Sequence, residues 1–246
     1  MELVFDVAAW FADPANWSGR DAIPQRLFEH VALSAAAVIT GLAIAVPLAL
    51  YIGHTGRGAF LVINLTNLGR ALPSYAVLVI LFGFFLGAST DLGVVTNAPT
   101  FLAMVALAVP PIVTNTHAGL RDVDRDLVEA ARGMGMRGSE VLRRVEVPIA
   151  VPVIIVGLRI ATVQVIATAA LGAVIGGGGL GRYIVQGLAR FDDARLAAGA
   201  LLVILLALLA ELFFIWLQRR VVSSGIRQTE RPAYSQAGQA RAAPGA

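Results

Sequence analysis

Five apolar stretches constrain the fold most strongly, because a helix that crosses a bilayer needs about 20 mainly apolar residues. They cover residues 32–52, 72–87, 100–115, 149–175 and 197–217. The second stretch is short, but the apolar residues 60–68 can extend it below a kink at Pro73. Hydrophobic residues make up 57% of the chain and charged residues 14%, a composition that excludes an ordinary soluble domain. The sequence therefore predicts an all-α, polytopic membrane protein with about five transmembrane helices.

The chain divides into three parts around these stretches. Residues 1–31 contain acidic residues and prolines and no continuous apolar run, so we expect no cleaved signal peptide there. Trp10 and Trp17 instead favour an extracytoplasmic segment that lies at the membrane interface. Residues 32–220 form the predicted transmembrane domain. Residues 221–246 are rich in Ala, Gln, Gly and Pro and lack periodicity, which indicates a disordered cytoplasmic tail.

The arginines predict the orientation, since short loops rich in positive charge stay on the cytoplasmic side. With five spans, one set of loops comprises residues 53–71, residues 117–147 and everything after residue 217. This set holds 13 of the 19 arginines, whereas the opposite set holds five. We therefore predict a multi-pass protein of the cell (inner) membrane with its N-terminus outside and its C-terminus in the cytoplasm.

Several kinds of chemistry are excluded by residues that the chain lacks. It has neither cysteine nor lysine, which removes disulfides, thiolate metal sites and Schiff-base chemistry. His30, His54 and His117 share no spacing typical of a metal site, and no serine-hydrolase motif occurs. The run Gly176–Arg182 resembles a phosphate loop only superficially, because it lacks the Lys and the Ser or Thr of that motif. We expect no catalytic site, metal or cofactor in this chain, and no nucleic-acid partner.

The long loop before the fourth apolar stretch carries the most information. Asp126 and Glu129 have the spacing of a capping box, which predicts a short helix that begins near Asp126. Gly133 and Gly135 are expected to end that helix, and Ser139 to cap a second helix that stops before the fourth stretch. A solvated amphipathic connection is the simpler interpretation of such a charged loop.

The same loop resembles the signature of the integral-membrane subunits of ATP-binding-cassette (ABC) importers. The match has valines at two positions where the family has Ile and Leu, and consists of Glu129, Ala130, Ala131, Gly135 and Pro148. The resemblance implies a type I importer permease fold, in which residues 118–148 form a coupling helix that docks on a cytoplasmic ATPase. Gly133 belongs to the same set of coupling residues. ATP and Mg²⁺ are then bound by the ATPase subunit and not by this chain.

Three further segments resemble the branch of that family that imports osmoprotectants such as glycine betaine, choline or carnitine. They are Glu29-His30, Ala71–Ser74 and Ile175–Gly181. The methionine importers share parts of this pattern, so methionine or another small solute stays an alternative. The resemblance implies a solute path or gate whose candidate residues are Pro73, Ser74, Tyr75, Gly176, Gly177, Gly178 and Gly179. A tight turn between helices is the plainer interpretation of the glycines.

The resemblance also implies the partners of the chain. Two permease subunits, identical or different, would join two ATPase subunits and an extracytoplasmic substrate-binding protein that selects the solute. A secondary transporter or a channel is the alternative from another class. Secondary transporters are generally built from paired repeats, however, and the five stretches show no obvious duplication.

Two ionisable residues lie well inside the apolar stretches. Arg159 is about 16 Å from the cytoplasmic end of its helix and Glu211 about 12 Å, given the rise of an α-helix. A charge in mid-membrane costs about 2.5 to 3.5 kcal/mol and therefore needs a partner. We predict that Arg159 and Glu211 pair, within or between subunits, and fix the packing of the fourth and fifth spans.

Overall fold

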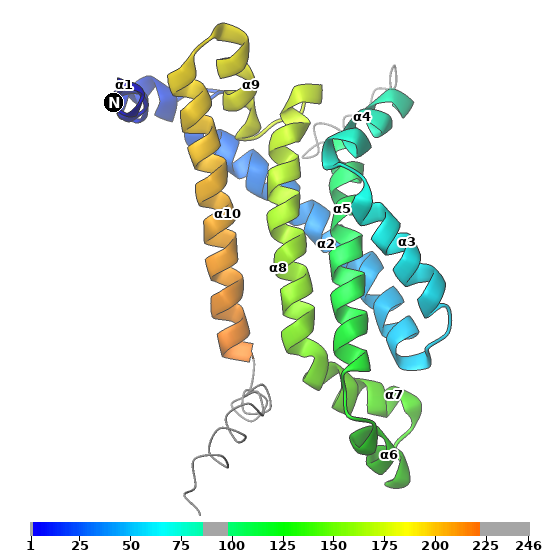
Figure 1. Ribbon diagram of the computed structural model, residues 1–246. Helices are drawn as coiled ribbons and strands as arrows, with labels where there is room; N and C mark the ends of the chain where they lie inside the picture. The colour runs from blue at the N-terminus through cyan, green and yellow to red at the C-terminus, as the bar shows by residue number, and fades with distance from the viewer. Residues whose placement is uncertain (1, 86–97, 222–246) are drawn as a thin grey trace, which may run out of the picture.

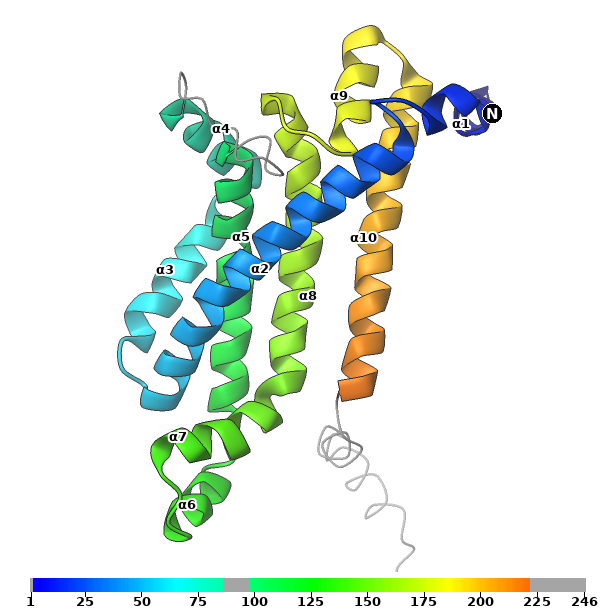
Figure 2. The same cartoon turned by 180° about the vertical axis from the view of Figure 1, so that it is seen from behind.

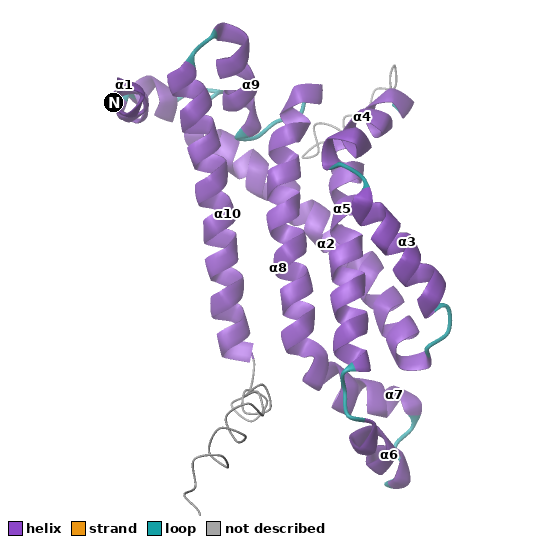
Figure 3. Ribbon diagram, viewed as in Figure 1, coloured by secondary structure: helices purple, strands orange, loops and turns teal. Residues whose placement is uncertain are grey.

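The computed structural model describes residues 2–85 and 98–221, and every regular element in those ranges is a helix (Figure 3). In chain order the elements are α1 (Glu2–Ala12), the 3-10 helix η1 (Pro14–Trp17), α2 (Ile23–Thr55), α3 (Ala59–Ala71), α4 (Ser74–Phe84), α5 (Ala98–Arg121), α6 (Arg125–Gly133), α7 (Gly138–Val141), the π-helix η2 (Leu142–Glu146), α8 (Val147–Gly172), the 3-10 helix η3 (Ala173–Ile175), α9 (Gly181–Arg190) and α10 (Asp193–Val221). The all-α prediction is confirmed. The predicted tail lies outside the described residues from residue 222 onward.

Four helices in the described ranges are each long and apolar enough to cross a membrane. They are α2, α5, the helix that runs unbroken from Gly138 to Ile175, and α10. The bent pair α3 and α4 makes a fifth when it is counted as one span, which agrees with the predicted number. The helices extend past the expected stretches. For example, α2 has 33 residues, begins with Pro24 in its first turn, where a missing N–H is harmless, and ends at left-handed Gly56.

The second span departs from the expected single kinked helix. Helices α3 and α4 meet at 95° across a short break at Leu72 and Pro73 (Figure 1). Proline has no N–H to donate and crowds the residue before it, and Leu72 accordingly takes an extended conformation with a ψ of 129°. The stretch is therefore two short helices at nearly a right angle. Its expected end, residues 86 and 87, lies outside the described residues.

Helix α5 forms the centre of the bundle. Of its apolar stretch 67% is buried, against 6% in α10. Helices α2, α3, α4 and α8 pack against α5, and Figure 2 shows α2 crossing α5 and α8 diagonally. The core contains many small side chains that are fully buried, among them Ala37, Ala45, Ala108 and Ala161. Small residues let helix backbones approach closely, which is how membrane helices commonly associate.

The N-terminal segment packs on the same end of the bundle as α9 (Figure 1). Helix α1 contacts α10, and the ring of Trp10 meets the ring of Tyr183 edge to face, with 5.3 Å between the centroids. The indole N–H of Trp17 donates to the carbonyl of Phe11 at 2.7 Å. Residues 2–22 are thus folded onto the helices, and their position at a membrane interface stays a prediction.

Candidate functional site

The candidate residues gather at two opposite ends of the bundle (Figure 1). Helices α6 and α7 lie at one end, within residues 118–148, which we call the 118–148 loop. The glycines before α9 lie at the other end, and we call residues 176–180 the glycine loop. The spans α2 and α8 run between these two ends, so both helices contribute to both regions.

Helix α6 begins at Arg125, close to the predicted start near Asp126, but its N-cap lies two residues before the one that the capping box indicated. Asp124, and not Asp126, is the N-cap, and its carboxylate accepts the N–H of Asp126 at 2.9 Å. Asp126 lies in the first turn, where its charge still favours the positive end of the helix. Asp122, Asp124 and Asp126 alternate along the chain, so spacing to Glu129 alone did not identify which of them leaves the helical conformation.

Gly135 closes helix α6. The last helical residue is Gly133, and Gly135 has a left-handed backbone with a φ of +86°. The N–H of Gly135 reaches the carbonyl of Arg132 at 2.9 Å, and the N–H of Met136 reaches that of Ala131 at 3.2 Å, which are the two bonds of a Schellman motif. A Cβ at Gly135 would meet no atom within 4 Å, so the backbone conformation, and not space, requires glycine. The prediction is therefore confirmed for Gly135, whereas Gly133 lies within the helix and does not break it.

The second helix of the loop differs from the prediction at both ends. It begins after Arg137, whose N–H is accepted by the carboxylate of Glu140 at 2.9 Å, so Ser139 is not the cap. It also does not stop before Pro148, because α7 continues through the π-turn η2 into α8. Pro148 lies at the junction of η2 and α8, where the π-turn already interrupts the regular hydrogen-bond pattern that a proline would break.

The three residues of the Glu-Ala-Ala triplet do not share one environment. Glu129 and Ala130 are exposed, whereas Ala131 is 2% exposed and packs inward. Leu127 and Met134, on the same short helix and its cap, are also exposed large apolar residues. The loop thus presents an acidic group beside apolar side chains, a surface suited to a protein partner.

His54 and Glu146, which the sequence did not single out, form a hydrogen bond at this end of the bundle. Nδ1 of His54, at the end of α2, lies 2.6 Å from Oε2 of Glu146 in the π-turn. They border a cavity of about 220 Å³ whose other walls are α5 and α6, the latter including Glu129 and Arg132. The only sequence signal was an acidic residue three positions before a predicted span, which calls for a partner.

The glycine loop is docked on the start of α2. The carboxylate of Glu29 accepts the N–H of Gly179 at 3.0 Å, and Nδ1 of His30 accepts the N–H of Leu180 at 3.2 Å. Gly179 has a φ of +79°, and a Cβ there would come within 2.9 Å of Nδ1 of His30. Two segments singled out separately in the sequence, 150 residues apart, thus meet in one hydrogen-bonded turn. A gating role for this turn stays a prediction.

The hydrogen bonds of His30 determine its tautomer. Because Nδ1 accepts from Leu180, the ring hydrogen is on Nε2, which faces the carbonyl of Ile166 in α8 at 3.0 Å. His30 is fully buried, with only 1% of the residue exposed. A neutral imidazole therefore joins α2 to both α8 and the glycine loop.

Charged groups surround this turn on the N-terminal side. Arg26 donates to Asp21 and, at 2.6 Å, to Glu29. The hydrogen bond from Arg26 lowers the pKa of Asp21 below its ordinary value, so this carboxylate stays ionised near neutral pH. Burial raises the pKa of Tyr183 to about 12, so its phenol keeps the proton that it donates to the carbonyl of Asp21.

The other candidate path residues lie at the elbow between α3 and α4. Pro73 precedes α4, and Ser74 and Tyr75 form its first turn. The Tyr75 side chain is exposed. Helix α4 contacts η3, the short helix just before the glycine loop, so the two sets of candidates belong to neighbouring elements. No hydrogen bond in the described residues joins them directly.

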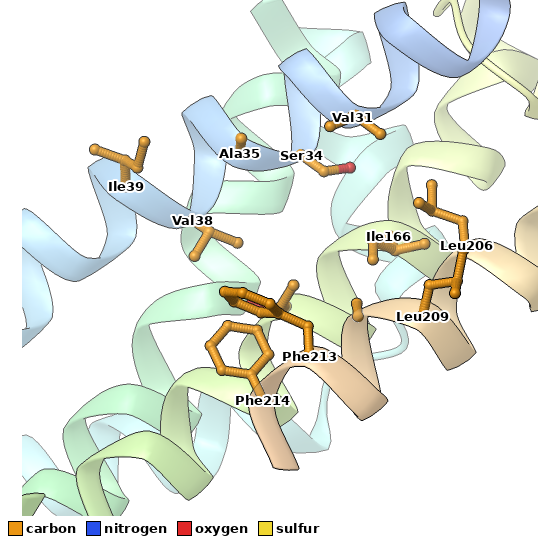
Figure 4. Close-up of a pocket in the computed structure, with 12 residues that line it drawn as sticks. Val31, Ser34, Ala35, Val38, Ile39, Ile166, Leu206, Leu209, Phe213 and Phe214 are labelled. Carbon is orange, nitrogen blue, oxygen red and sulfur yellow. The ribbon is translucent and has the colours of Figure 1, made fainter. Parts of the chain in front are cut away.

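An apolar groove lies between α2, α8 and α10 (Figure 4). It has a volume of about 400 Å³, and the rings of Phe213 and Phe214 lie on its α10 side, 5.3 Å apart. Its polar side chains are Ser34 and Thr162, and none of its lining residues is charged. The groove offers apolar contact but no countercharge for an ionic solute. Residues 2–85 and 98–221 also contain no group of three His, Cys, Asp or Glu that could hold a metal ion.

Arg159 and Glu211 come together within one chain. Nη1 of Arg159 in α8 lies 3.4 Å from Oε1 of Glu211 in α10. The two side chains are 26% and 38% exposed, respectively. The pair therefore bridges the two helices that the sequence predicted it would join, and its importance for assembly stays a prediction.

We expect that alanine at either position lowers the amount of assembled permease, since it leaves the other charge without its partner at a depth where a charge costs about 2.5 to 3.5 kcal/mol. Exchanging the two residues, Arg159→Glu with Glu211→Arg, should restore assembly. Size-exclusion chromatography of the detergent-extracted complex measures it. If both single variants assemble and transport normally, the residues reach the interface separately and the pair has no structural role.

Comparison with known sequences identifies the family. The model described as "Binding-protein-dependent transport system inner membrane component" matches residues 27–223. The chain is 37% identical over 199 residues to the glycine betaine/carnitine/choline transport system permease protein OpuCB of Bacillus subtilis (strain 168), covering 81% of this chain and 88% of that protein. It is also 37% identical over 200 residues to the osmoprotectant import permease protein OsmW of Salmonella typhimurium, covering 81% and 92%.

Solved structures agree on the fold. A structure of the MetNI methionine ABC transporter in an inward facing conformation has a chain that matches with a TM-score of 0.74 at 21% identity, covering 86% of this chain and 99% of that chain. In this family the ATPase activity resides in a partner subunit, no cofactor is expected in the permease, and an ATPase and a binding protein are the implied partners. The chain therefore belongs to the family of binding-protein-dependent transport system inner membrane components, the multi-pass permease subunits of ABC importers.

Proposed function

We propose that this permease imports an osmoprotectant such as glycine betaine, choline or carnitine. The observation that carries the proposal is the 36–37% identity, over about four-fifths of the chain, to permeases whose names specify these solutes or osmoprotectants in general. The likeness to a methionine transporter is lower, at 21% identity, and concerns the fold. Methionine is therefore the second candidate.

In this proposal the extracytoplasmic binding protein, and not the permease, selects the solute. A quaternary ammonium group is usually held by several aromatic rings, each contact contributing about 0.5 to 2 kcal/mol. The groove in Figure 4 has two rings and no charged lining residue, which supports a weak path through the permease and high-affinity selection by the extracytoplasmic binding protein.

Uptake by the reconstituted importer tests the proposed solute. The permease is co-expressed with its ATPase and binding protein, purified as a complex and placed in liposomes that contain ATP. We expect ATP-dependent accumulation of labelled glycine betaine, choline or carnitine, and none when the binding protein is left out. Accumulation of methionine with none of the three osmoprotectants would overturn the proposal.

We further propose that two permease subunits and two ATPase subunits form the working importer, with the 118–148 loop docked on the ATPase. Five spans in one chain are too few to enclose a solute path and expose it alternately to both sides. The exposed Glu129 supports this docking, because a carboxylate at a rim can pair with a basic group of the partner. The coupling residues are Glu129, Ala130, Ala131, Gly133, Gly135 and Pro148.

Docking on a cytoplasmic ATPase requires the 118–148 loop to face the cytoplasm and the N-terminal segment to face outward. The chain has no cysteine, so single cysteines can report the orientation without a background. In intact cells we expect a membrane-impermeant maleimide to label Ser18→Cys and not Ser139→Cys. Permeabilised cells should label both. Labelling of Ser139→Cys alone in intact cells would reverse the proposed orientation.

A further inference from the structure

Helix α2 is joined by polar contacts at both of its ends to the helix that runs from Gly138 to Ile175. At one end His54 meets Glu146, 2.6 Å apart. At the other end Nε2 of His30 faces the carbonyl of Ile166 at 3.0 Å. Between these contacts the two helices pack directly, with α2 crossing α8 diagonally (Figure 2). The two helices therefore form one frame that reaches from the 118–148 loop to the glycine loop.

The contact between His54 and Glu146 lies at the seam between the loop and the membrane span. Glu146 is the last residue of the π-turn, and its side chain is only 9% exposed. Nδ1 of His54 must carry a hydrogen, because it faces a carboxylate oxygen. The opposite ring nitrogen, Nε2, lies 3.3 Å from where a Cβ on Gly138 would stand. The ring thus lies between the first residue of α7 and the π-turn.

A buried carboxylate keeps its place only while it is paired. A displacement of the π-turn and the start of α8 must therefore either carry His54, and with it α2, or break this contact. At its far end α2 holds the glycine loop through Glu29 and His30. A displacement of the 118–148 loop then reaches the glycine loop through two helices instead of one.

We infer that His54 and Glu146 are positioning residues for ATP-driven transport: they fasten α2 to the 118–148 loop, so that α2 and α8 respond to the ATPase as one body. This inference rests on the proposed coupling role of the loop. It assigns no contact with solute or nucleotide to either residue. Its measurable consequence is the number of solute molecules transported for each ATP hydrolysed.

Three replacements of His54 separate positioning from a general effect on folding. The side-chain nitrogen of asparagine can stand where Nδ1 stands and donate to Glu146, whereas that of glutamine corresponds to Nε2 and is directed toward Gly138. Reconstituted complexes of His54→Asn, His54→Gln and His54→Ala are compared in liposomes, with uptake and ATP hydrolysis measured on the same preparation. We expect His54→Asn to keep the ratio of solute to ATP, and the other two to lower it about fivefold or more.

Two results would contradict a positioning role for His54. If His54→Gln or His54→Ala keeps the ratio, or if uptake falls only in proportion to the amount of assembled complex, His54 has a structural role alone and the inference is overturned. Should His54→Ala not assemble, the comparison of asparagine with glutamine decides. Glu129→Ala tests the coupling role of the 118–148 loop separately. If Glu129→Ala lowers the ratio of solute to ATP and His54→Gln leaves it unchanged, the inference is overturned and the proposed function stays intact. An unchanged ratio in both overturns the coupling role of the loop as well.

Discussion

Replacing Gly135 with valine is expected to lower solute uptake about tenfold or more and to uncouple ATP hydrolysis from transport, while the permease still inserts into the membrane. The left-handed conformation costs a residue with a Cβ about 1 to 2 kcal/mol, and a β-branched residue tolerates it least. Valine therefore opens the Schellman motif and misplaces the end of α6. A factor of ten corresponds to about 1.4 kcal/mol. Uptake and binding-protein-stimulated hydrolysis, each per assembled complex, provide the measurement.

Gly133 supplies the matched control for this experiment. It lies two residues away, has an ordinary helical backbone, and a Cβ there would also meet no atom within 4 Å. Gly133→Ala should lower uptake far less than Gly135→Val, since alanine favours the helical conformation that this position already has and keeps the turn that ends α6. Normal uptake and normal stimulated hydrolysis in Gly135→Val would count decisively against a coupling role for the 118–148 loop.

Replacing Gly179 with alanine is expected to lower the midpoint of thermal unfolding by about 5 °C or more. Two effects combine at this position. The left-handed backbone is unfavourable for alanine, and the new Cβ would stand 3.2 Å from the Cα of His30, which cannot turn aside as a flexible side chain can. Moving the loop away from α2 would in turn weaken the bonds that Glu29 and His30 accept. Thermal unfolding of the detergent-solubilised permease measures the loss.

Gly19 separates these two effects. It has a φ of +93°, but a Cβ there would meet nothing within 4 Å. The shift in the unfolding midpoint of Gly19→Ala thus measures the cost of the left-handed backbone alone. The additional shift in Gly179→Ala measures the cost of the close contact with His30. Equal shifts in both variants would show that the contact with His30 contributes nothing, and no shift in Gly179→Ala would show that the glycine loop does not depend on α2.

The membrane spans could be predicted from the sequence because the thickness of a bilayer fixes the length of an apolar helix. The details at helix ends could not. Asp122, Asp124 and Asp126 are equally suited to cap a helix by composition, and only the course of the backbone selects Asp124. Likewise Pro73 predicted a kink, but the 95° bend depends on how α4 packs against α5 and α8.

Some contacts in the candidate sites could also be predicted from the sequence, and others could not. The proximity of Arg159 and Glu211 followed from their similar depth, because a charge inside an apolar helix needs a partner. The pairing of His54 with Glu146 was missed, since the two residues are 92 positions apart and His54 stands at the end of its span, where water can also satisfy a polar group. Glu29-His30 and the glycine run were noticed as separate motifs, but no local pattern encodes a contact over 150 positions.

The π-turn η2 has a consequence for the geometry of the whole loop. Such a turn holds one more residue than the regular helix would use to join α7 to α8. Each residue advances an α-helix by about 100° around its axis. In a regular helix, deleting one residue would therefore turn the preceding segment by roughly that angle. In the π-turn the extra residue lies within one wider turn, so deleting one of residues 142–145 would restore a regular turn, keep α7 in nearly its present direction and leave Glu146 beside His54. The wider turn thus lets the link between α7 and α8 hold one more residue while the face that the loop presents to a partner stays nearly unchanged.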